Sequence, residues 1–184
     1  MSPVFLFFAV FLQVSNVPPD SGKTCLAPYW GGILAGYSTD REVRQLYGDG
    51  VYFDSIGDCG SRFYTNPSKT VTMEVVLTND CIVEEVEVRQ GFHPPHQLAE
   101  GDQDKMVSDF LDHSHGLGNF YELMFGKTFT EVEETNGPPQ HVDVDDGETR
   151  WIYESVCHCE LSSGIAYRFK NGLVVAVEFW AESN

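Results

Sequence analysis

Two stretches of alternating sequence constrain the fold most. The first, "TVTMEVVL", places apolar side chains at alternate positions between Thr70 and Leu77, with threonine and glutamate among them. The second, "CIVEEVEVR", spaces its valines with glutamates, and "TND" at Thr78 to Asp80 stands between the two as a turn. A period of two residues is that of a strand with one face in a core and the other in water. These stretches predict an antiparallel hairpin.

The C-terminal part of the chain shows the same pattern again. Its strand-like runs are "RWIYESVCHCEL", "GIAYRFKN" and "LVVAVEFWAE". In the second run Ile165, Tyr167 and Phe169 alternate with more polar or smaller residues, and "KNG" follows as a hairpin turn. We therefore expect a second group of antiparallel strands here.

A helix is indicated between these features and the N-terminus. In "STDREVRQLYG", Thr39 and Glu42 have the spacing of a capping box, and Val43, Leu46 and Tyr47 form an apolar stripe. Gly48 stands where a glycine commonly ends a helix. The stripe predicts that this helix packs on a sheet.

Helical spacing returns in the second half. Met106, Val107, Phe110 and Leu111 suggest one helix, and "NFYELMFG", from Asn119 to Gly126, suggests another. The stretch "EVEETNGPPQHVDVDDGE" then reads as a long acidic loop. The order of helix, glycine, loop and aromatic strand matches the first half, so the sequence predicts a duplication with a period near 78 residues. In it, Gly48 and Gly126 are equivalent helix ends, and "RFY" corresponds to "RWIY".

This pattern resembles a known family. A short helix ending in "LYGDG" or "MFGKT", an "RFY" or "RWIY" strand and a hairpin ending "KNGLVVAVEF" are similar to the tandem repeat of β-lactamase inhibitory protein and the small outer-membrane assembly lipoproteins. The resemblance covers residue 33 to about 182. It implies an α+β fold of two tandem repeats, each with one or two short helices packed on an antiparallel sheet. It also implies a non-enzymatic, exported protein that works by surface binding.

The N-terminus supports export. Val4 to Leu12 is an apolar run of nine residues, whereas a membrane-spanning helix needs about 20, so it suits the core of a secretory signal and predicts no transmembrane span. The alternatives are a buried N-terminal strand or a misassigned start, either of which would make the protein cytoplasmic rather than periplasmic or extracellular. The expected organisation is a signal segment at 1–16, a lead-in at 17–32, repeat 1 at 33–92, a linker at 93–104 and repeat 2 at 105–184.

Charge restricts the partners. The chain has 28 acidic and 11 basic residues, a formal charge of −17, which repels nucleic acid and anionic lipid. Sixteen of the carboxylates lie between Glu84 and Glu148, as a solvated face or as a docking surface for a basic partner or cations. We expect a protein partner, of basic character, that binds the sheet face and acidic loops without a cofactor.

Aromatic side chains are the candidate contacts, because such residues anchor protein interfaces. The alternative for each is a place in the core. The candidates are Tyr52, Tyr64, Trp151, Tyr153 and Trp180.

Histidine and cysteine provide a different hypothesis, a metal-binding protein or a Cys–His enzyme. Zinc needs four converging ligands, and the best set here is His113, His115, Cys157 and Cys159. The five cysteines also permit one or two disulfides in an exported protein, with the connectivity left open.

Two further motifs fail on spacing. The acidic "DVDDGE" at Asp143 to Glu148 lacks the spacing of a calcium loop and is expected to be a flexible loop that binds cations weakly at most. "FGKTF" lacks the first glycine of a phosphate-binding loop, since Tyr121 occupies that position.

Overall fold

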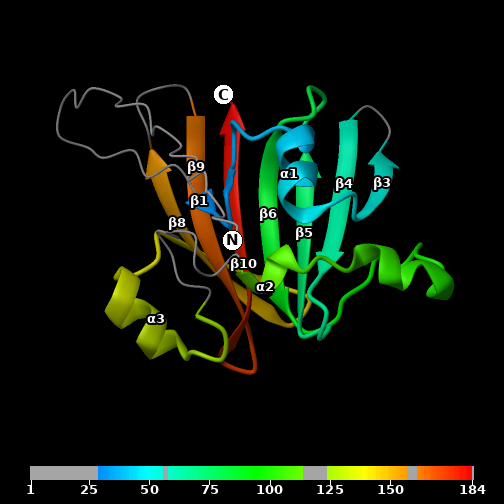
Figure 1. The fold of residues 1–184 in the computed structure, drawn as a ribbon. Helices are drawn as coiled ribbons and strands as arrows, with labels where there is room; N and C mark the ends of the chain where they lie inside the picture. Colours follow the sequence, from blue (N-terminus) through cyan, green and yellow to red (C-terminus); the bar gives the residue numbers. More distant parts are fainter. Residues whose placement is uncertain (1–28, 56–57, 114–123, 157–160, 184) are drawn as a thin grey trace, which may run out of the picture.

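The computed structural model describes residues 29–55, 58–113, 124–156 and 161–183. Its main feature is one antiparallel sheet of eight strands in the order β3-β4-β5-β6-β10-β9-β8-β7, which Figure 1 shows from β3 at the right toward β8 at the left. The strands are β3 (Val51–Ser55), β4 (Asp58–Thr65), β5 (Val71–Leu77), β6 (Val83–Gln90), β7 (His141–Asp145), β8 (Glu148–Val156), β9 (Leu161–Lys170) and β10 (Leu173–Ser183).

The remaining elements are short. A two-stranded ribbon of β1 (Tyr29–Trp30) and β2 (Ile33–Leu34) comes before the sheet. The helices are α1 (Asp40–Tyr47), the 3-10 helix η1 (Glu100–Met106), α2 (Phe110–His113) and α3 (Phe129–Asn136).

The predicted α+β class, with two tandem repeats of helices packed on sheets, is wrong. Of the described residues, 49% lie in strands and 20% in helices, so the fold is mostly β. The strands form one continuous sheet, because β6 pairs with β10 and Val88 lies opposite Val177. The alternating sequences therefore identified the strands, but they did not show that both groups join edge to edge.

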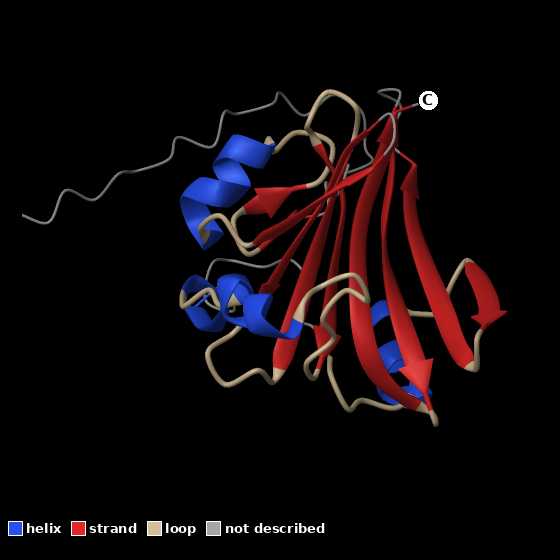
Figure 2. Ribbon diagram, turned by 90° about the vertical axis from the view of Figure 1, so that its right-hand side faces the viewer, coloured by secondary structure: helices blue, strands red, loops and turns tan. Residues whose placement is uncertain are grey.

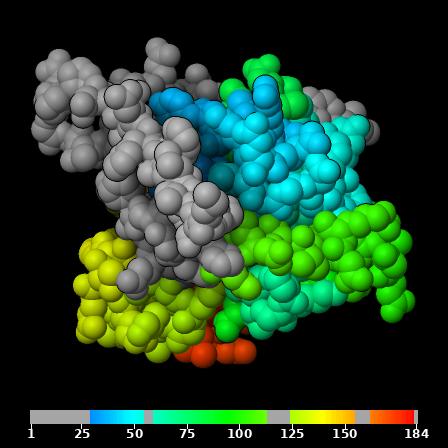
Figure 3. All heavy atoms as spheres, in the orientation of Figure 1, coloured from blue at the N-terminus to red at the C-terminus, as the bar shows by residue number. Residues whose placement is uncertain are grey.

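The core lies on one face of the sheet. Alternate strand residues project to this side, and Val43 and Tyr47 of α1, Leu111 of α2 and Val132 of α3 pack against them in one cluster. In Figure 2 the helix at the upper left is α1, and in Figure 3 α1 (cyan) lies above the green segment with η1 and α2, while α3 is yellow. Three α-helices thus cover a single face.

The helix predicted at Thr39 to Gly48 is confirmed. Thr39 and Glu42 form both hydrogen bonds of the capping box, and the helix ends at Gly48, which has a φ of 85°. Tyr47 is buried, and its ring centroid lies 5.5 Å from that of Tyr64 on β4.

The helix boundaries predicted for the second half are wrong. Of the segment from Met106 to Leu111, only the end is α-helical, in α2, and Gly126 lies in a turn. The last α-helix is α3, which begins after Thr128 with its own capping box and ends at Gly137. Gly48 and Gly126 are therefore not equivalent helix ends, and the period near 78 residues fails. The segment expected at 119–126 lies largely outside the described residues.

The predicted acidic loop is partly a hairpin. β7 and β8 pair there, with Asp145 opposite Glu148, and the turn between them is Asp146–Gly147 with φ values of 45° and 76°. Two residues with positive φ are what a tight hairpin turn needs, and Asp–Gly supplies them at low cost. The "DVDDGE" stretch is thus a strand end and a turn.

One disulfide lies among the described residues. Cys59 of β4 is bonded to Cys81, in the turn between β5 and β6. The other cysteines, Cys25, Cys157 and Cys159, fall outside the described ranges. Within the part of the chain that the structure describes, no helix is long and apolar enough to cross a membrane.

Candidate binding face

The second face of the sheet is the strongest candidate for a functional surface. The core cluster takes one set of alternate strand residues, so the other set projects to the side opposite the α-helices. We call this side the open face. It includes Val51, Phe53, Phe63, Glu74, Glu85, Glu87, Arg89, Glu148, Arg150, Ile152, Arg168, Glu178 and Trp180.

Three glutamates lie side by side across the middle of the open face. Glu74 of β5 is directly opposite Glu87 of β6, and Glu87 is directly opposite Glu178 of β10. Like charges at directly opposite positions of neighbouring strands repel each other and destabilise the pairing. Such a row needs cations nearby.

Arginines supply cations on one side of this row. The buried carboxylate of Glu178 accepts a 2.6 Å hydrogen bond from Nε of Arg150 and another from Nε of Arg168. Burial opposes the charge on Arg168, yet Glu178 beside it raises the pKa of its guanidinium. Glu178 is therefore neutralised by two arginines from β8 and β9.

A third arginine joins two more carboxylates. Nε of Arg89 donates to Oε1 of Glu87 at 2.9 Å, and its Nη1 donates to Oε1 of Glu148 at 3.0 Å. Burial would raise the pKa of Glu148, but its bonds to Arg89 outweigh this and hold the pKa below its usual value. Each arginine in this network thus forms an ion pair with at least one glutamate.

Two carboxylates remain without an arginine. Within the described ranges neither Glu74 nor Glu85 forms an ion pair. Burial raises the pKa of Glu85 to about 7, and the charges of Glu178 and Glu87 add to this while Arg150 and Arg168 oppose it. Burial also raises the pKa of Glu74, although Ser61 donates a hydrogen bond to it.

Trp180 lies on β10, and its ring packs toward β9 and β8. It is directly opposite Glu85, is 9% exposed, and packs with Ile152 and Ala166 in a small second cluster. Gly164 on β9 makes room for the ring, because a Cβ there would lie 2.6 Å from Cζ2 of Trp180. Among the described residues, the buried indole Nε1 has no hydrogen-bond acceptor.

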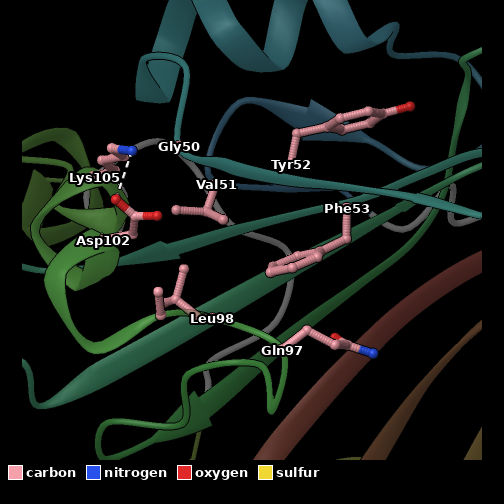
Figure 4. Close-up of a pocket in the computed structure, with 9 residues that line it drawn as sticks. Gly50, Val51, Tyr52, Phe53, Gln97, Leu98, Asp102 and Lys105 are labelled. Carbon is pink, nitrogen blue, oxygen red and sulfur yellow. Dashed lines mark ion pairs between the residues drawn. The ribbon is translucent and has the colours of Figure 1, made fainter.

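A cleft of about 350 Å³ opens beside β3, at one end of the open face. Figure 4 shows Val51 and Phe53 projecting from one side of β3 toward Leu98 and Gln97, while Tyr52 projects from the other side. Lys105 and Asp102 form an ion pair of 2.6 Å at one end. The cleft gives the charged face an apolar border.

The five predicted aromatic contacts occupy different environments. Tyr52 is 43% exposed and has the guanidinium of Arg62 4.8 Å from its ring centroid. Tyr64 is fully buried in the core. Trp151 and Tyr153 are partly buried on the helix side, where the Tyr153 hydroxyl donates to Gly137 O at 3.0 Å. These four side chains belong to the face with the helices, and only Trp180 lies on the open face.

The predicted metal ligands fall outside what the structure describes. Cys157, Cys159 and His115 lie in undescribed segments, and the side chain of His113 is not described either. Elsewhere, in the described ranges, no group of three or more His, Cys, Asp or Glu side chains could hold a metal ion.

Sequence reasoning missed the glutamate row. The alternating glutamates of "VEEVEV" do place Glu85 and Glu87 on one face of a strand, which is the only signal for it. Glu178 is 91 residues further along the chain than Glu87, and only the pairing of β6 with β10 brings the two together. The same pairing brings the arginines of β8 and β9 close to these glutamates.

Comparisons with known proteins add a distant structural neighbour. No protein-family model matches the sequence, and no curated protein matches it. The crystal structure of a DUF4309 family protein, YjgB from Bacillus subtilis, is similar with a TM-score of 0.48 and 14% identity over 82% of this chain and 83% of that one. A likeness of this size establishes neither a shared family nor a shared function.

Proposed function

We propose that this protein is exported and binds another protein through the open face, without catalysing a reaction. The observation that carries the proposal is the row of Glu74, Glu87 and Glu178, which is set across three neighbouring strands on the side opposite the α-helices. Like charges at directly opposite positions destabilise strand pairing, so a sheet face that only contacts solvent gains nothing from this row.

The charge of the face favours a basic partner. Its carboxylates outnumber its arginines, because among the described residues Arg89, Arg150 and Arg168 form ion pairs with other carboxylates, and Glu74 and Glu85 form none. The whole chain carries −17, so long-range attraction would speed association with a basic protein. Such binding weakens with added salt.

The cleft beside β3 supplies apolar contact area at the border of this surface. Val51 and Phe53 line it together with Leu98. Protein interfaces commonly combine a desolvated apolar part with charged groups that fix the register. The cleft and the glutamate row would therefore belong to one footprint.

Export is supported by the bond between Cys59 and Cys81. Disulfides persist mainly in oxidising compartments. This observation fits the secretory signal expected at 1–16.

Affinity capture with a matched pair of variants tests the proposal. The immobilised protein is incubated at low salt with envelope and medium fractions of its source organism. Val51→Arg places a bulky cation in the cleft on the open face, and Val142→Arg places the same group on the opposite side of the other edge strand, β7. We expect a salt-sensitive partner that Val51→Arg loses and Val142→Arg retains.

Two results would contradict this function. One is a partner that both variants retain, because binding would then avoid the open face. The other is the absence of any protein above background for the wild type. Circular dichroism confirms that both variants are folded.

A further inference from the structure

β3 is an unprotected edge of the sheet along its first three residues. It pairs with β4 on one side, and among the described residues no strand pairs with its other side. Val51, Tyr52 and Phe53 follow one another there without a charged residue, whereas the opposite edge strand, β7, carries Asp143 and Asp145. Charged side chains commonly keep an edge strand from pairing with another chain. Of the two edges, that of β3 is therefore the one open to a further strand.

The cleft beside β3 runs along the backbone of this edge. Gly50, Val51, Tyr52 and Phe53 all line it, although Figure 4 shows the side chain of Tyr52 projecting away from those of Val51 and Phe53. What these consecutive residues have in common is their backbone. The other wall consists of residues 97–99 and part of η1.

The backbone groups of Tyr52 point away from the sheet. A Cβ at Gly60 of β4 would collide with Phe53 O, and a Cβ at Gly50 would lie 2.9 Å from Phe63 O of β4. The carbonyls of Phe53 and Phe63 therefore point into the pair of β3 and β4. Because backbone groups alternate in direction along an antiparallel strand, the N–H and C=O of Tyr52 point outward. This residue thus presents one donor and one acceptor to the cleft.

The side chains along this edge specify what a docked strand would carry. On the cleft side, Val51 and Phe53 lie across from Leu98, which suits an apolar side chain. On the other side Tyr52 is 43% exposed, and the exposed Asp54 forms no ion pair with a described residue. Basic side chains fit there, and the charge of −17 favours them.

We propose that an extended segment of the partner protein adds to the sheet beside β3, antiparallel to it, with an apolar side chain in the cleft and basic side chains beside Asp54. This inference rests on the proposed function and specifies the part of the partner that binds. Main-chain hydrogen bonds to Tyr52 provide affinity, and the cleft selects alternate side chains. The strand pairs of the sheet are all antiparallel, so the added one continues their pattern.

This arrangement fixes which backbone groups of the segment bond to β3. Residues directly opposite each other in an antiparallel pair have their side chains on the same face. The residue opposite Tyr52 is therefore a basic one, and its N–H and C=O point to β3. The apolar residues direct their backbone groups to the outside.

Calorimetric titration of the wild type with a heptapeptide tests this pattern at about 0.15 M salt. The probe is acetylated and amidated Lys-Val-Lys-Phe-Lys-Val-Lys, compared with one version N-methylated at the two inner lysines and one N-methylated at the two valines. Both versions keep the charge of the parent. We expect valine methylation to change the affinity less than about twofold and lysine methylation to weaken it about tenfold or more. Equal affinities of the two methylated peptides, a greater loss with the valine version, or no binding of the parent would overturn the proposal.

Tyr52→Pro removes the same hydrogen bond from the protein. A proline is tolerated in an edge strand where its nitrogen faces outward. Tyr52→Ala is the matched control, because it also loses the ring but keeps the N–H. We expect the parent peptide to bind Tyr52→Pro about tenfold more weakly than Tyr52→Ala, with circular dichroism showing that both are folded. Equal affinities of the two folded variants would contradict strand addition.

Failure of strand addition is distinguishable from failure of the function. If capture of the partner is lost with Val51→Arg but is equal for Tyr52→Pro and Tyr52→Ala, the open face binds and strand addition is wrong. If Val51→Arg retains the partner, the proposed function itself is wrong. A wild-type dimer in analytical ultracentrifugation that Tyr52→Pro abolishes would assign this edge to a second copy and overturn the partner strand.

Discussion

At the residue scale, the raised pKa of Glu85 shows the cost of crowding carboxylates on the open face. Its carboxylate lies half-buried among Glu87, Glu178 and two arginines, and burial raises its pKa to about 7. An unfolded glutamate has a pKa near 4.3. The folded state therefore holds this proton to a higher pH than the unfolded chain does, so its stabilising contribution is complete below about pH 4 and is lost as pH rises through about 7.

Glu85→Gln should therefore stabilise the protein at high pH, where it removes a charge that is costly to bury. We expect almost no effect on the free energy of unfolding at pH 4, and a stabilisation of roughly 2 kcal/mol at pH 8, because the amide stays neutral. Urea denaturation at both pH values measures it. Glu134→Gln on α3 is the control and should show no such difference. A pH-independent effect of Glu85→Gln would refute the account of this residue.

Gly164 is a second residue with a specific consequence. Its missing side chain leaves space for Trp180, and a Cβ would also lie 2.7 Å from Tyr153 O. Gly164→Ala should lower the free energy of unfolding by about 1 to 3 kcal/mol, because the ring or a strand has to move. Gly101→Ala has open space around it and should stay within about 0.5 kcal/mol. Equal values in denaturant titrations would contradict the packing.

At the scale of elements, α3 depends on its first turn. Thr128 accepts from Glu131 N, and Glu131 in return accepts from Thr128 N at 2.8 Å. Thr128→Ala removes this cap and should cost about 1 kcal/mol of unfolding free energy. Thr135→Ala in the same helix is the control, because alanine is a better helix former there and the expected change is neutral or stabilising. A loss as large as that of Thr128→Ala would show that the cap is unimportant.

The sequence predicts elements best where one local rule is sufficient. The capping box at Thr39 and the alternation from Val71 to Leu77 depend only on neighbours in the chain, and both appear in the structure. The Asn171–Gly172 turn is another case, with φ values of 52° and 79°. α3 carries the same capping signal at Thr128 and Glu131, yet its acidic composition resembles that of a loop.

The open face could not be predicted in the same way. Its residues come from strands that are distant in sequence, and their contacts depend on the pairing of β6 with β10. Alternation shows which residues share a face of one strand, but it contains no information about which strands become neighbours. The glutamate row and its arginines are therefore a property of the assembled sheet.

At the scale of the whole molecule, the sheet separates an apolar core from a charged face. One face takes the α-helices and nearly all the large apolar side chains of the core. The other face carries paired and unpaired charges with an apolar cleft at its border. This division explains why the charge of −17 need not disturb the core, and it is the reason for proposing the open face as the binding surface.

Carboxyl footprinting of the complex tests this central claim most directly. The protein, alone and with its captured partner, is treated with a carbodiimide and an amine, and the modified glutamates are measured by mass spectrometry. We predict that labelling of Glu74 and Glu85 falls strongly in the complex, whereas labelling of Glu133 and Glu134 on α3 is unchanged. Protection of the α3 glutamates with undiminished labelling of Glu74 and Glu85 would contradict it.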